Sequence, residues 1–414
     1  MADTQVGIEA LNVYCGLAQI PVDVLFDGRG LNKERMGNLM MEQRSLGLPF
    51  EDPITNAVNA AKPIVDALTP EQKDRIEILV VSTESGIDYS KSVSSYVHDY
   101  LGLSRRCRVI EAKQACYAAT GAVQMGVAYV ASGVSPGAKV LVIATDVALA
   151  DGRAEYMEPV MGAGSAAVLV SGYPRVLSVD FGAFGNYSFE ILDQGRPAPT
   201  IELADVDGSL FAYLDCLKHA FLAYRDRVEG ADFASTFDYL VMHTPFAGLV
   251  KASHRKMMRE FAGANPAEIE QDFTRRVLPS VNYSSKVGNL CSGSVYLGLA
   301  GLIDAVKPGS SGHRVGLFSY GSGCCSEFFS GLIDQESTAA MAEMKIGEHL
   351  ARRCEVTFEE YEELLKGTMG CLVPIKDRDV EIGRWSTILD RRGVDRKVLA
   401  LKAVRNYHRK YEWV

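Results

Sequence analysis

A repeated order of segments is the feature that most constrains the fold of this chain. In each half, a run of buried-type residues ends in a polar tip, small residues lead into an apolar helix, and a second buried-type run follows. The first-half segments are IEILVVSTES (76 to 85), KQACYAATGAVQMGVAYV (113 to 130) and AKVLVIATDV (138 to 147). The second-half segments are FDYLVMHTPF (237 to 246), VGNLCSGSVYLGLAGLI (287 to 303) and HRVGLFSYGSG (313 to 323). This alternation predicts an α/β fold with parallel sheets covered by helices on both faces.

The length of the chain fits two such units. Its 414 residues exceed what one hydrophobic core usually supports, and 47% of them are hydrophobic against 23% charged. Because no flexible linker separates the units, we expect two tightly packed halves, 1–172 and 173–414. From about residue 340 the chain becomes charged and helix-like (EEYEELLKG), which predicts a helical C-terminal appendage on the second half. Aromatic residues in the final NYHRKYEWV are expected to anchor it.

Charge and composition exclude several classes of protein. A net charge of -9 argues against nucleic acid as a partner, and an acidic partner would need a local basic patch. Nine cysteines, an odd number with no C-x-x-C pair, predict reduced thiols in the cytoplasm. We find no signal peptide, no membrane span, no G-x-G-x-x-G dinucleotide fingerprint and no histidine spacing suited to a metal. The sequence therefore predicts a soluble cytoplasmic protein with no bound cofactor and no metal.

Cys116 is a candidate nucleophile. It lies where a strand-to-helix turn is predicted, and the small residues AATGA that follow would let a substrate approach closely. A helix N-terminus offers unsatisfied N–H donors and partial positive charge, which would lower the pKa of the thiol and stabilise an oxyanion. A buried structural cysteine is the alternative.

Polar residues end the four predicted strands. Glu84, Asp146, His243 and Tyr320 each close a buried-type run, and ligands of such sheets bind at the carboxyl ends of the strands. A carboxylate at Glu84 suits proton transfer, and Pro245 turns the chain so that the His243 imidazole faces the edge of the sheet. A solvated loop glutamate and a capping histidine are the alternatives.

Two turns in the second half could contact a substrate. Asn289 precedes the second apolar helix, where it could cap the helix, donate its amide to a thioester carbonyl, or do both. The glycines of YGSG, residues 320 to 323, would let backbone N–H groups approach whatever occupies the site.

Long segments along nearly the whole chain resemble the hydroxymethylglutaryl-CoA synthase family. They are VGIEALNVY, EDPITNAVNAAKPIVDAL, STESGIDYSKSVSSYVHDYLGL, EAKQACYAATGA, MHTPFAGLVK, KVGN and FSYGSGCCSEFFSG. The resemblance is closest to the branch that acts in polyketide β-branching on acyl groups held by acyl carrier protein. It implies a thiolase-like, five-layered αβαβα fold of two pseudo-duplicated halves.

The resemblance also implies roles for individual residues. Cys116 would take acetyl from a donor thioester, and Glu84 would remove a proton from the acetyl methyl group. The resulting carbon would attack the β-carbonyl of a β-ketoacyl thioester that His243 positions, and hydrolysis would release a hydroxymethylglutaryl product. The positions that match the relatives' substrate pocket are Tyr117, Asp146, Asn289, Tyr320 and Ser322, and the N–H groups of Cys116 and Ser322 match an oxyanion hole.

Two departures from the family bear on the substrate. Relatives that use coenzyme A commonly carry a lysine two positions after the aromatic residue of H-x-P-[FY], where this chain has Gly248. The loop at 150–164 also differs and could shape the entrance for a carrier. These departures favour an acceptor carried on acyl carrier protein over one on free coenzyme A. The resemblance implies phosphopantetheine-linked thioesters on acyl carrier proteins for both donor and acceptor.

An acidic carrier would need basic residues at the entrance. The candidate carrier-binding residues form two clusters, Arg105, Arg106 and Arg108, and Lys251, Arg255 and Lys256. Either cluster could equally be a solvated helix face. The family resemblance further implies a homodimer.

Four other functions compete with this interpretation. They are a hydroxymethylglutaryl-CoA synthase of the mevalonate pathway, a ketoacyl synthase or thiolase, a non-catalytic scaffold with the same fold, and a Cys–His hydrolase. The first differs only in the acceptor carrier, for which Gly248 is the discriminating residue. The others have no use for Glu84, Cys116 and His243 together.

Overall fold

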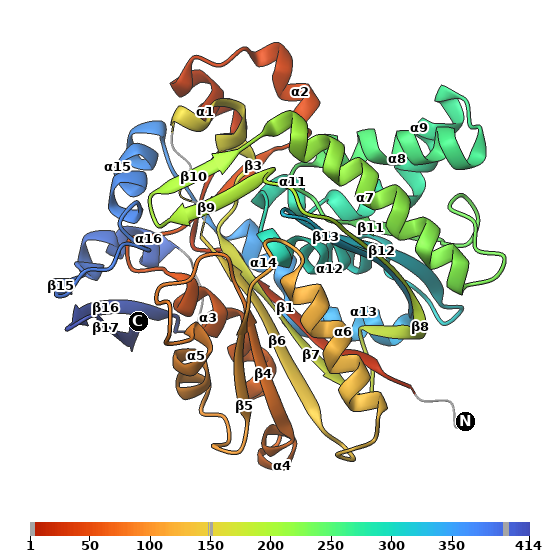
Figure 1. The fold of residues 1–414 in the computed structure, drawn as a ribbon. Coiled ribbons are helices and arrows are strands. Elements are labelled where there is room, and N and C mark those ends of the chain that lie inside the picture. The colour runs from red at the N-terminus through yellow and green to blue at the C-terminus, as the bar shows by residue number, and fades with distance from the viewer. Residues whose placement is uncertain (1–4, 148, 150–151, 392–396) are drawn as a thin grey trace.

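A nine-stranded mixed sheet is the centre of the fold in the computed structural model, which describes residues 5–147, 149, 152–391 and 397–414 (Figure 1). The strand order is β11-β12-β13-β8-β1-β7-β6-β4-β5. The strands are β1 (Gly7–Tyr14), β4 (Ile76–Ser82), β5 (Arg108–Ala112), β6 (Lys139–Asp146), β7 (Gly164–Ser171), β8 (Leu177–Ser188), β11 (Tyr239–Met242), β12 (His313–Gly321) and β13 (Cys325–Ile333). Because β1 and β8 pair only through Gly7–Ser178 and Ile8–Leu177, the sheet consists of two parts that meet at one corner.

Among the described residues, parallel pairing within the nine-stranded sheet occurs in two places. β4 pairs in parallel with β5 and β6, and β11 pairs in parallel with β12. The pairs β6–β7, β1–β7, β8–β13 and β12–β13 are antiparallel. The expectation of parallel sheets is therefore wrong for these strands, because β7 and β13 follow the preceding strand without the crossover helix that a parallel pair requires.

The repeated segments form the elements that their pattern predicts. In the first half they are β4, α6 (Ala118–Ala131) and β6, and in the second half they are β11, α12 (Ser294–Val306) and β12. Helix α12 is apolar on nearly all sides and is buried over most of its length, as a helix between two layers must be.

The two faces of the sheet belong to separate cores, which gives five layers. Val140 on β6 and Val315 on β12 share one core with α6 and α12. The next residue on β6, Leu141, faces α3 (Pro53–Asp66) and α5 (Val93–Leu101) instead. Phe318 on β12 faces α7 (Val206–Arg227) and α8 (Ala247–Ala262). Helices α6 and α12 therefore lie between the two parts of the sheet, and the other four helices cover the outside.

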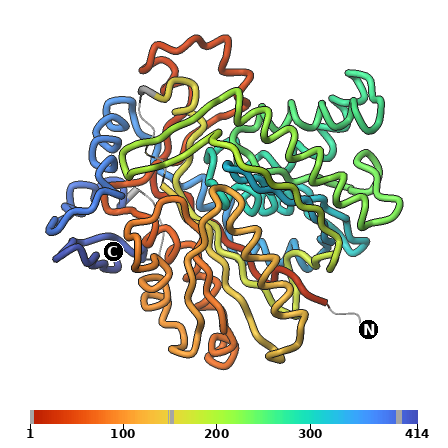
Figure 2. The backbone as a smooth tube through the Cα atoms, in the orientation of Figure 1, coloured from red at the N-terminus to blue at the C-terminus, as the bar shows by residue number. Residues whose placement is uncertain are grey.

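The C-terminal segment extends over more of the fold than the sequence predicts. Helix α13 (Gln335–Met344) packs on α12 and β1, and α15 (Phe358–Thr368) is helical as expected. The chain then ends in a hairpin of β16 (Leu399–Arg405) and β17 (His408–Trp413), which lies beside α3 and α5 in the blue part of Figure 2.

The prediction that this appendage packs on the second half is wrong for the hairpin. Asp52, the buried N-cap of α3, accepts hydrogen bonds at its Oδ2 from Arg409 (2.7 Å) and Tyr411 (2.8 Å). Because a buried carboxylate needs such partners, these contacts hold the hairpin on the first half. The expected aromatic anchoring is confirmed, since Tyr411 packs edge-on against Tyr96 and Tyr100.

Two further expectations concern the chain as a whole. Between β7 and β8 the chain passes from one part of the sheet to the other, and the division into 1–172 and 173–414 stays a prediction. Within the described ranges, the helices are all too short or too polar to cross a membrane.

Candidate active site

Cys116 lies in the turn between β5 and α6, one residue before the N-cap of the helix. It is 4% exposed. The turn after β12 packs directly against it, since a Cβ atom on Gly321 would lie 2.5 Å from Gln114 O and 2.6 Å from Tyr117 N. Only glycine fits at this approach, so the turn at 320–323 lies beside Cys116 as the sequence predicts.

The pKa of the Cys116 thiol differs from the expectation. The neighbouring Cys291 thiol lowers this pKa, but burial and the charges of Glu84 and Asp146 outweigh its effect and raise the pKa above its ordinary value. The predicted lowering is therefore wrong, because desolvation and nearby carboxylates disfavour a thiolate more than the partial charge of the helix favours it. The thiol is protonated at neutral pH, and its proton must be passed on when the sulfur attacks.

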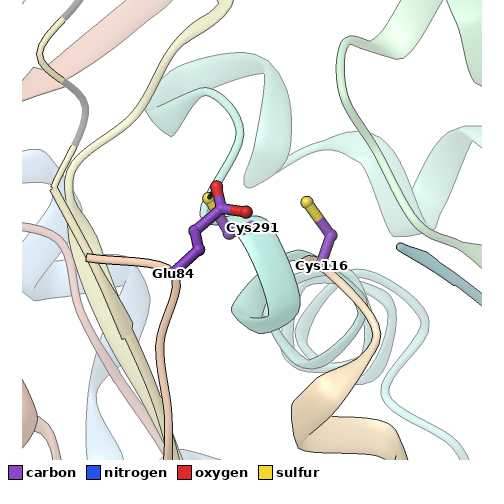
Figure 3. Close-up of side chains that lie close together, drawn as sticks. All are labelled: Glu84, Cys116 and Cys291. Carbon is purple, nitrogen blue, oxygen red and sulfur yellow. Dashed lines mark hydrogen bonds between the residues drawn. The ribbon is translucent and has the colours of Figure 1, made fainter. Parts of the chain in front are cut away.

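Glu84 and Cys291 converge on Cys116 from different parts of the chain (Figure 3). Glu84 follows β4, and Cys291 opens the short 3-10 turn η3 (Cys291–Gly293) ahead of α12. The Cys291 thiol donates a hydrogen bond to Glu84 Oε1 at 2.9 Å. One ligand atom from each of the three side chains lies within 4.8 Å of the others. A nucleophile and a carboxylate base are therefore adjacent.

The same three side chains are the group that could hold a metal ion. Two sulfurs and a carboxylate oxygen suit a soft divalent cation such as Zn²⁺ once the thiols lose their protons. The expectation that the protein has no metal stays a prediction.

Asp146 holds the loop that carries Glu84. Its Oδ1 accepts hydrogen bonds from the backbone N–H groups of Glu84 (2.9 Å) and Ser85 (3.1 Å). The hydroxyls of Thr83 (3.1 Å) and Ser85 (3.0 Å) donate to the same oxygen. Burial raises the pKa of Asp146 to about 8, and the charge of Glu84 contributes to the rise. Asp146 therefore sets the position of the base.

His243 follows the last residue of β11 and is 1% exposed. Its backbone carbonyl accepts a hydrogen bond from the Tyr213 hydroxyl at 2.7 Å, and its ring centroid lies 6.3 Å from that of Tyr320. Burial lowers the pKa of His243 to about 3, so the imidazole is neutral. Within the described part of the chain its Nδ1 is buried and has no hydrogen-bond partner.

Tyr320 and Ser322 connect the site to a hairpin above it. The Tyr320 hydroxyl donates to Asp193 Oδ2 at 2.6 Å, and the N–H of Gly323 donates to Asp193 Oδ1 at 2.9 Å. Asp193 immediately precedes the hairpin of β9 (Gln194–Ala198) and β10 (Ile201–Ala204), and the Ser322 hydroxyl lies 3.5 Å from Gln194 Oε1. Tyr320 therefore anchors this hairpin, a role that the sequence did not predict.

Tyr117 and Asn289 have partners of their own. The Tyr117 hydroxyl donates to Glu327 Oε2 at 2.7 Å, which ties the start of α6 to β13. The side-chain oxygen of Asn289 accepts hydrogen bonds from the Cys291 N–H and the Ser294 hydroxyl, both at 2.9 Å. Asn289 therefore caps the η3 turn just ahead of α12.

The two basic clusters lie on different elements. Arg105 and Arg106 precede β5, and Arg108 pairs with Ile78 near the beginning of β4, whereas Glu84 follows the opposite end of that strand. Lys251, Arg255 and Lys256 lie on α8, which begins four residues after His243. Lys251 is paired with Glu270 at 2.7 Å. In the loop at 150–164, residues 150 and 151 lie outside the described part of the chain.

Sequence reasoning missed three residues at the site, Cys291, Asp193 and Arg196. Arg196 on β9 donates to Ser85 Oγ at 3.1 Å and, more weakly, to Glu84 O at 3.5 Å. Asp193 and Arg196 lie in a polar stretch without a strand pattern, so nothing local identified them. Cys291 was visible only as a small polar residue beside Asn289.

In this five-layered αβαβα fold, a buried thiol lies at the start of a central helix and a carboxylate lies beside it. These features define the class of protein to which the chain belongs. It is that of the thiolase-like acyltransferases that form carbon–carbon bonds. The expected fold is confirmed by the solved structures to which the chain is similar.

Comparisons with known proteins then identify the family. The model for the N-terminal part of hydroxymethylglutaryl-coenzyme A synthase matches residues 3–174, and the model for the C-terminal part matches residues 263–370. The chain is 45% identical to the polyketide biosynthesis 3-hydroxy-3-methylglutaryl-ACP synthase PksG of Bacillus subtilis, over 99% of each chain. It is 32% identical to the hydroxymethylglutaryl-CoA synthase of Enterococcus faecalis, over 88% of this chain and 92% of the other.

A solved structure indicates the same family. The HMG synthase of the curacin biosynthetic pathway, in complex with apo donor-ACP, matches with a TM-score of 0.95 and 46% identity, over 99% of this chain and 100% of that one. The chain belongs to the hydroxymethylglutaryl-CoA synthase family. It is an acyltransferase that joins an acetyl unit to a ketoacyl thioester.

Proposed function

We propose that the protein condenses acetyl with the β-carbonyl of an acetoacetyl-type group, both carried as thioesters on acyl carrier proteins, in polyketide β-branching. The observation that carries the proposal is the adjacency of the Cys116 sulfur and the Glu84 carboxylate. A covalent nucleophile and a base for a carbon acid are what this condensation requires. PksG is named a 3-hydroxy-3-methylglutaryl-ACP synthase, and the HMG synthase of the curacin pathway is seen in complex with apo donor-ACP, which supports carrier-bound substrates here.

In the first step the Cys116 sulfur attacks the acetyl carbonyl of the donor. The bond from that carbonyl to the phosphopantetheine sulfur breaks, and the thiol proton of Cys116 passes to the departing sulfur. The backbone N–H groups of Cys116 and Ser322 are proposed to stabilise the oxyanion, because the turn at 320–323 packs against Cys116.

In the second step Glu84 takes a proton from the acetyl methyl group. The resulting carbanion attacks the β-carbonyl of the acceptor, and the alkoxide that forms takes the proton back from Glu84. His243 is neutral, so it is proposed to donate an N–H hydrogen bond to the acceptor oxygen and not to act as an acid. Water then hydrolyses the Cys116 thioester, which regenerates the thiol and releases the hydroxymethylglutaryl product on its carrier.

Gly248 supports a carrier protein over coenzyme A as the acceptor's carrier. A side chain at this position would overlap with the backbone carbonyl oxygen of Asn38 at the C-terminal part of α2 (Met36–Leu39). A lysine at position 248 would therefore require α2 to move away from α8.

We further propose that the carrier docks at the hollow between α7 and α8. The hollow is lined by the apolar residues Leu210, Leu214 and Ala252, by the basic residues Arg255, Lys256 and Arg259, and by one acidic residue, Glu260. Phe211, which lies between the two leucines on α7, is 69% exposed. Basic groups around apolar side chains fit an acidic carrier. The cluster Arg105, Arg106 and Arg108 is less suited, because Arg108 lies at the end of β5 away from Glu84.

The homodimer and the cytoplasmic location belong to the same proposal. Strand β5 is at the edge of the sheet, and Ile110 on β5 and Met125 on α6 are 51% and 74% exposed. An uncovered strand edge beside exposed apolar residues supports pairing with a second copy. Molar mass in solution tests this, and a monomer at micromolar concentration would contradict it.

The test of the proposed function compares acceptors. The protein is incubated with acetyl-carrier protein and either acetoacetyl-carrier protein or acetoacetyl-CoA, and the products are identified by mass spectrometry. We expect a branched hydroxy diacid on the carrier and a clear preference for the carrier-bound acceptor. Preference for acetoacetyl-CoA would indicate the mevalonate-pathway reaction, and a linear ketoacyl product would indicate a ketoacyl synthase or thiolase. A Cys116 peptide that gains no acetyl mass would indicate a scaffold.

A further inference from the structure

We propose that Cys291 is a positioning residue, whose thiol holds the Glu84 carboxylate beside the sulfur of Cys116 so that the base reaches the acetyl group. The inference rests on the proposed function, in which Glu84 deprotonates acetyl on Cys116. Its basis is the hydrogen bond from Cys291 Sγ to Glu84 Oε1 at 2.9 Å. Figure 3 shows both side chains directed into the space that Cys116 faces.

The backbone around Cys291 is built to aim this thiol. Cys291 has a φ of +49°, in the left-handed region that residues other than glycine and asparagine rarely adopt. The conformation is held by the Cys291 N–H, which donates to Asn289 Oδ1 at 2.9 Å, and by the Ser294 hydroxyl, which donates to the same oxygen. Strained conformations that neighbours over-determine cluster at functional sites, and here the strain directs a donor at the base.

The main chain around Glu84 has its own supports. Asp146 accepts the N–H of Glu84 at 2.9 Å, and Arg196 approaches its carbonyl at 3.5 Å. These contacts hold the loop but leave the direction of the long side chain open. Among the hydrogen bonds that the structure describes, the one from Cys291 reaches the Glu84 carboxylate itself.

The thiol of Cys291 suits this task chemically. The neighbouring Cys116 sulfur, burial and the charge of Glu84 raise the pKa of Cys291 well above its ordinary value, so the thiol keeps its proton and remains a donor to Glu84. A protonated, buried thiol does not compete with Cys116 for the acetyl group. A thiol is also a weak donor, so it can orient the carboxylate without preventing it from accepting a proton.

Because Cys291 acts through Glu84, the test isolates the step that Glu84 performs. The enzyme is acetylated with acetyl-carrier protein, freed of donor and transferred to D₂O without acceptor. Exchange of the acetyl methyl protons on the Cys116 peptide is then followed by mass spectrometry. The variants are Cys291→Ala and Cys291→Gly, which remove the donor, and Cys291→Ser, which keeps one. Glycine is included because it accepts a positive φ without strain, so one donor-free variant should fold. Glu84→Ala sets the background.

Because exchange is expressed per acetylated site, it does not depend on how fast each variant is acetylated, and we expect it to be about ten- to a hundredfold slower in Cys291→Ala and Cys291→Gly. Cys291→Ser should stay within about threefold of the wild type, since its hydroxyl still donates. Exchange at the wild-type rate in the donor-free variants would overturn the inference, as would a serine variant as slow as alanine. If the wild type itself takes up no acetyl, the proposed function is wrong. That outcome differs from normal acetylation with unchanged exchange, which would contradict only the role of Cys291.

Discussion

The backbone carbonyl oxygen of Asn38 occupies the position that a Cβ atom on Gly248 would need, so α2 and the first turn of α8 touch without a side chain between them. This contact fixes the segment from α1 (Val22–Arg29) to α2 against the helix that follows His243. It also gives a physical reason for glycine where relatives that use coenzyme A commonly carry lysine.

Gly248→Ala should therefore displace α2 and destabilise the protein. The methyl group must push backbone atoms apart, which typically costs about 1–3 kcal/mol. We expect a lower Tm by differential scanning calorimetry and a higher KM for the carrier-bound acceptor. Gly37→Ala in α2 is the matched control, because nothing lies within 4 Å of its added Cβ and alanine favours a helix. Equal Tm values for the wild type and Gly248→Ala would show that the contact is looser than described.

Replacing Glu84 should separate acetylation from condensation. Glu84→Ala leaves the Cys116 sulfur and its surrounding N–H donors in place, so acetyl should still be transferred to Cys116. Condensation should fall by about a hundredfold or more, which is the usual effect of losing a general base. Intact-mass measurement of the acetylated enzyme and product analysis check the two steps separately. Product formation at the wild-type rate would remove Glu84 from the mechanism.

Acidification should destabilise the protein through His243. Burial lowers the pKa of His243 from 6.5 to about 3, so the unfolded state binds a proton that the folded state refuses as the pH falls below 6.5. Stability is therefore lost with falling pH between these two values. From about pH 7.5 to about pH 5 the loss from this one group is about 2 kcal/mol.

Urea unfolding of the wild type and His243→Asn at the two pH values measures that contribution. Asparagine does not titrate, so the variant should lose about 2 kcal/mol less than the wild type over the same range. Parallel losses in the two proteins would mean that His243 is protonated in the folded state.

The C-terminal hairpin should be essential for stability. Arg409→Ala leaves the buried Asp52 carboxylate without its cation, and breaking such a pair typically costs about 3–5 kcal/mol. Lys410→Ala, on the exposed face of the same strand, is the control and should change stability by less than about 0.5 kcal/mol. Chemical denaturation measures the free energy of unfolding of both variants. Equal values would mean that water replaces Arg409 at Oδ2 of Asp52.

The parts of the site that the sequence predicts are those with a local signal. Glu84 and His243 each follow a buried-type run, and Cys116 lies where small residues lead into an apolar helix, so local patterns pointed to all three. The Cys291–Glu84 hydrogen bond joins residues 207 positions apart, and the Arg409–Asp52 contact joins residues 357 apart. No periodicity encodes such contacts, because they exist only after the layers have packed.

The strand directions and the thiol pKa were missed for a related reason. The alternation of strands and helices predicts parallel pairs, but the return strands β7 and β13 carry the same buried-type residues as the parallel ones. The lowered pKa of Cys116 followed from the helix alone, whereas burial and the charge of Glu84 depend on side chains from other elements. The strand directions and the thiol pKa were therefore both predicted from local sequence, whereas each also depends on elements that are distant in sequence.

Cys291 lies between α11 (Ser284–Val287) and α12, and this position has a consequence for the newly made chain. When a ribosome has delivered only the strands up to β7, Cys116 and Glu84 exist but Cys291 and the turn at 320–323 do not. The thiol then lacks the neighbours that complete its surroundings. The surroundings of Cys116 are therefore completed only by segments from the second half of the chain.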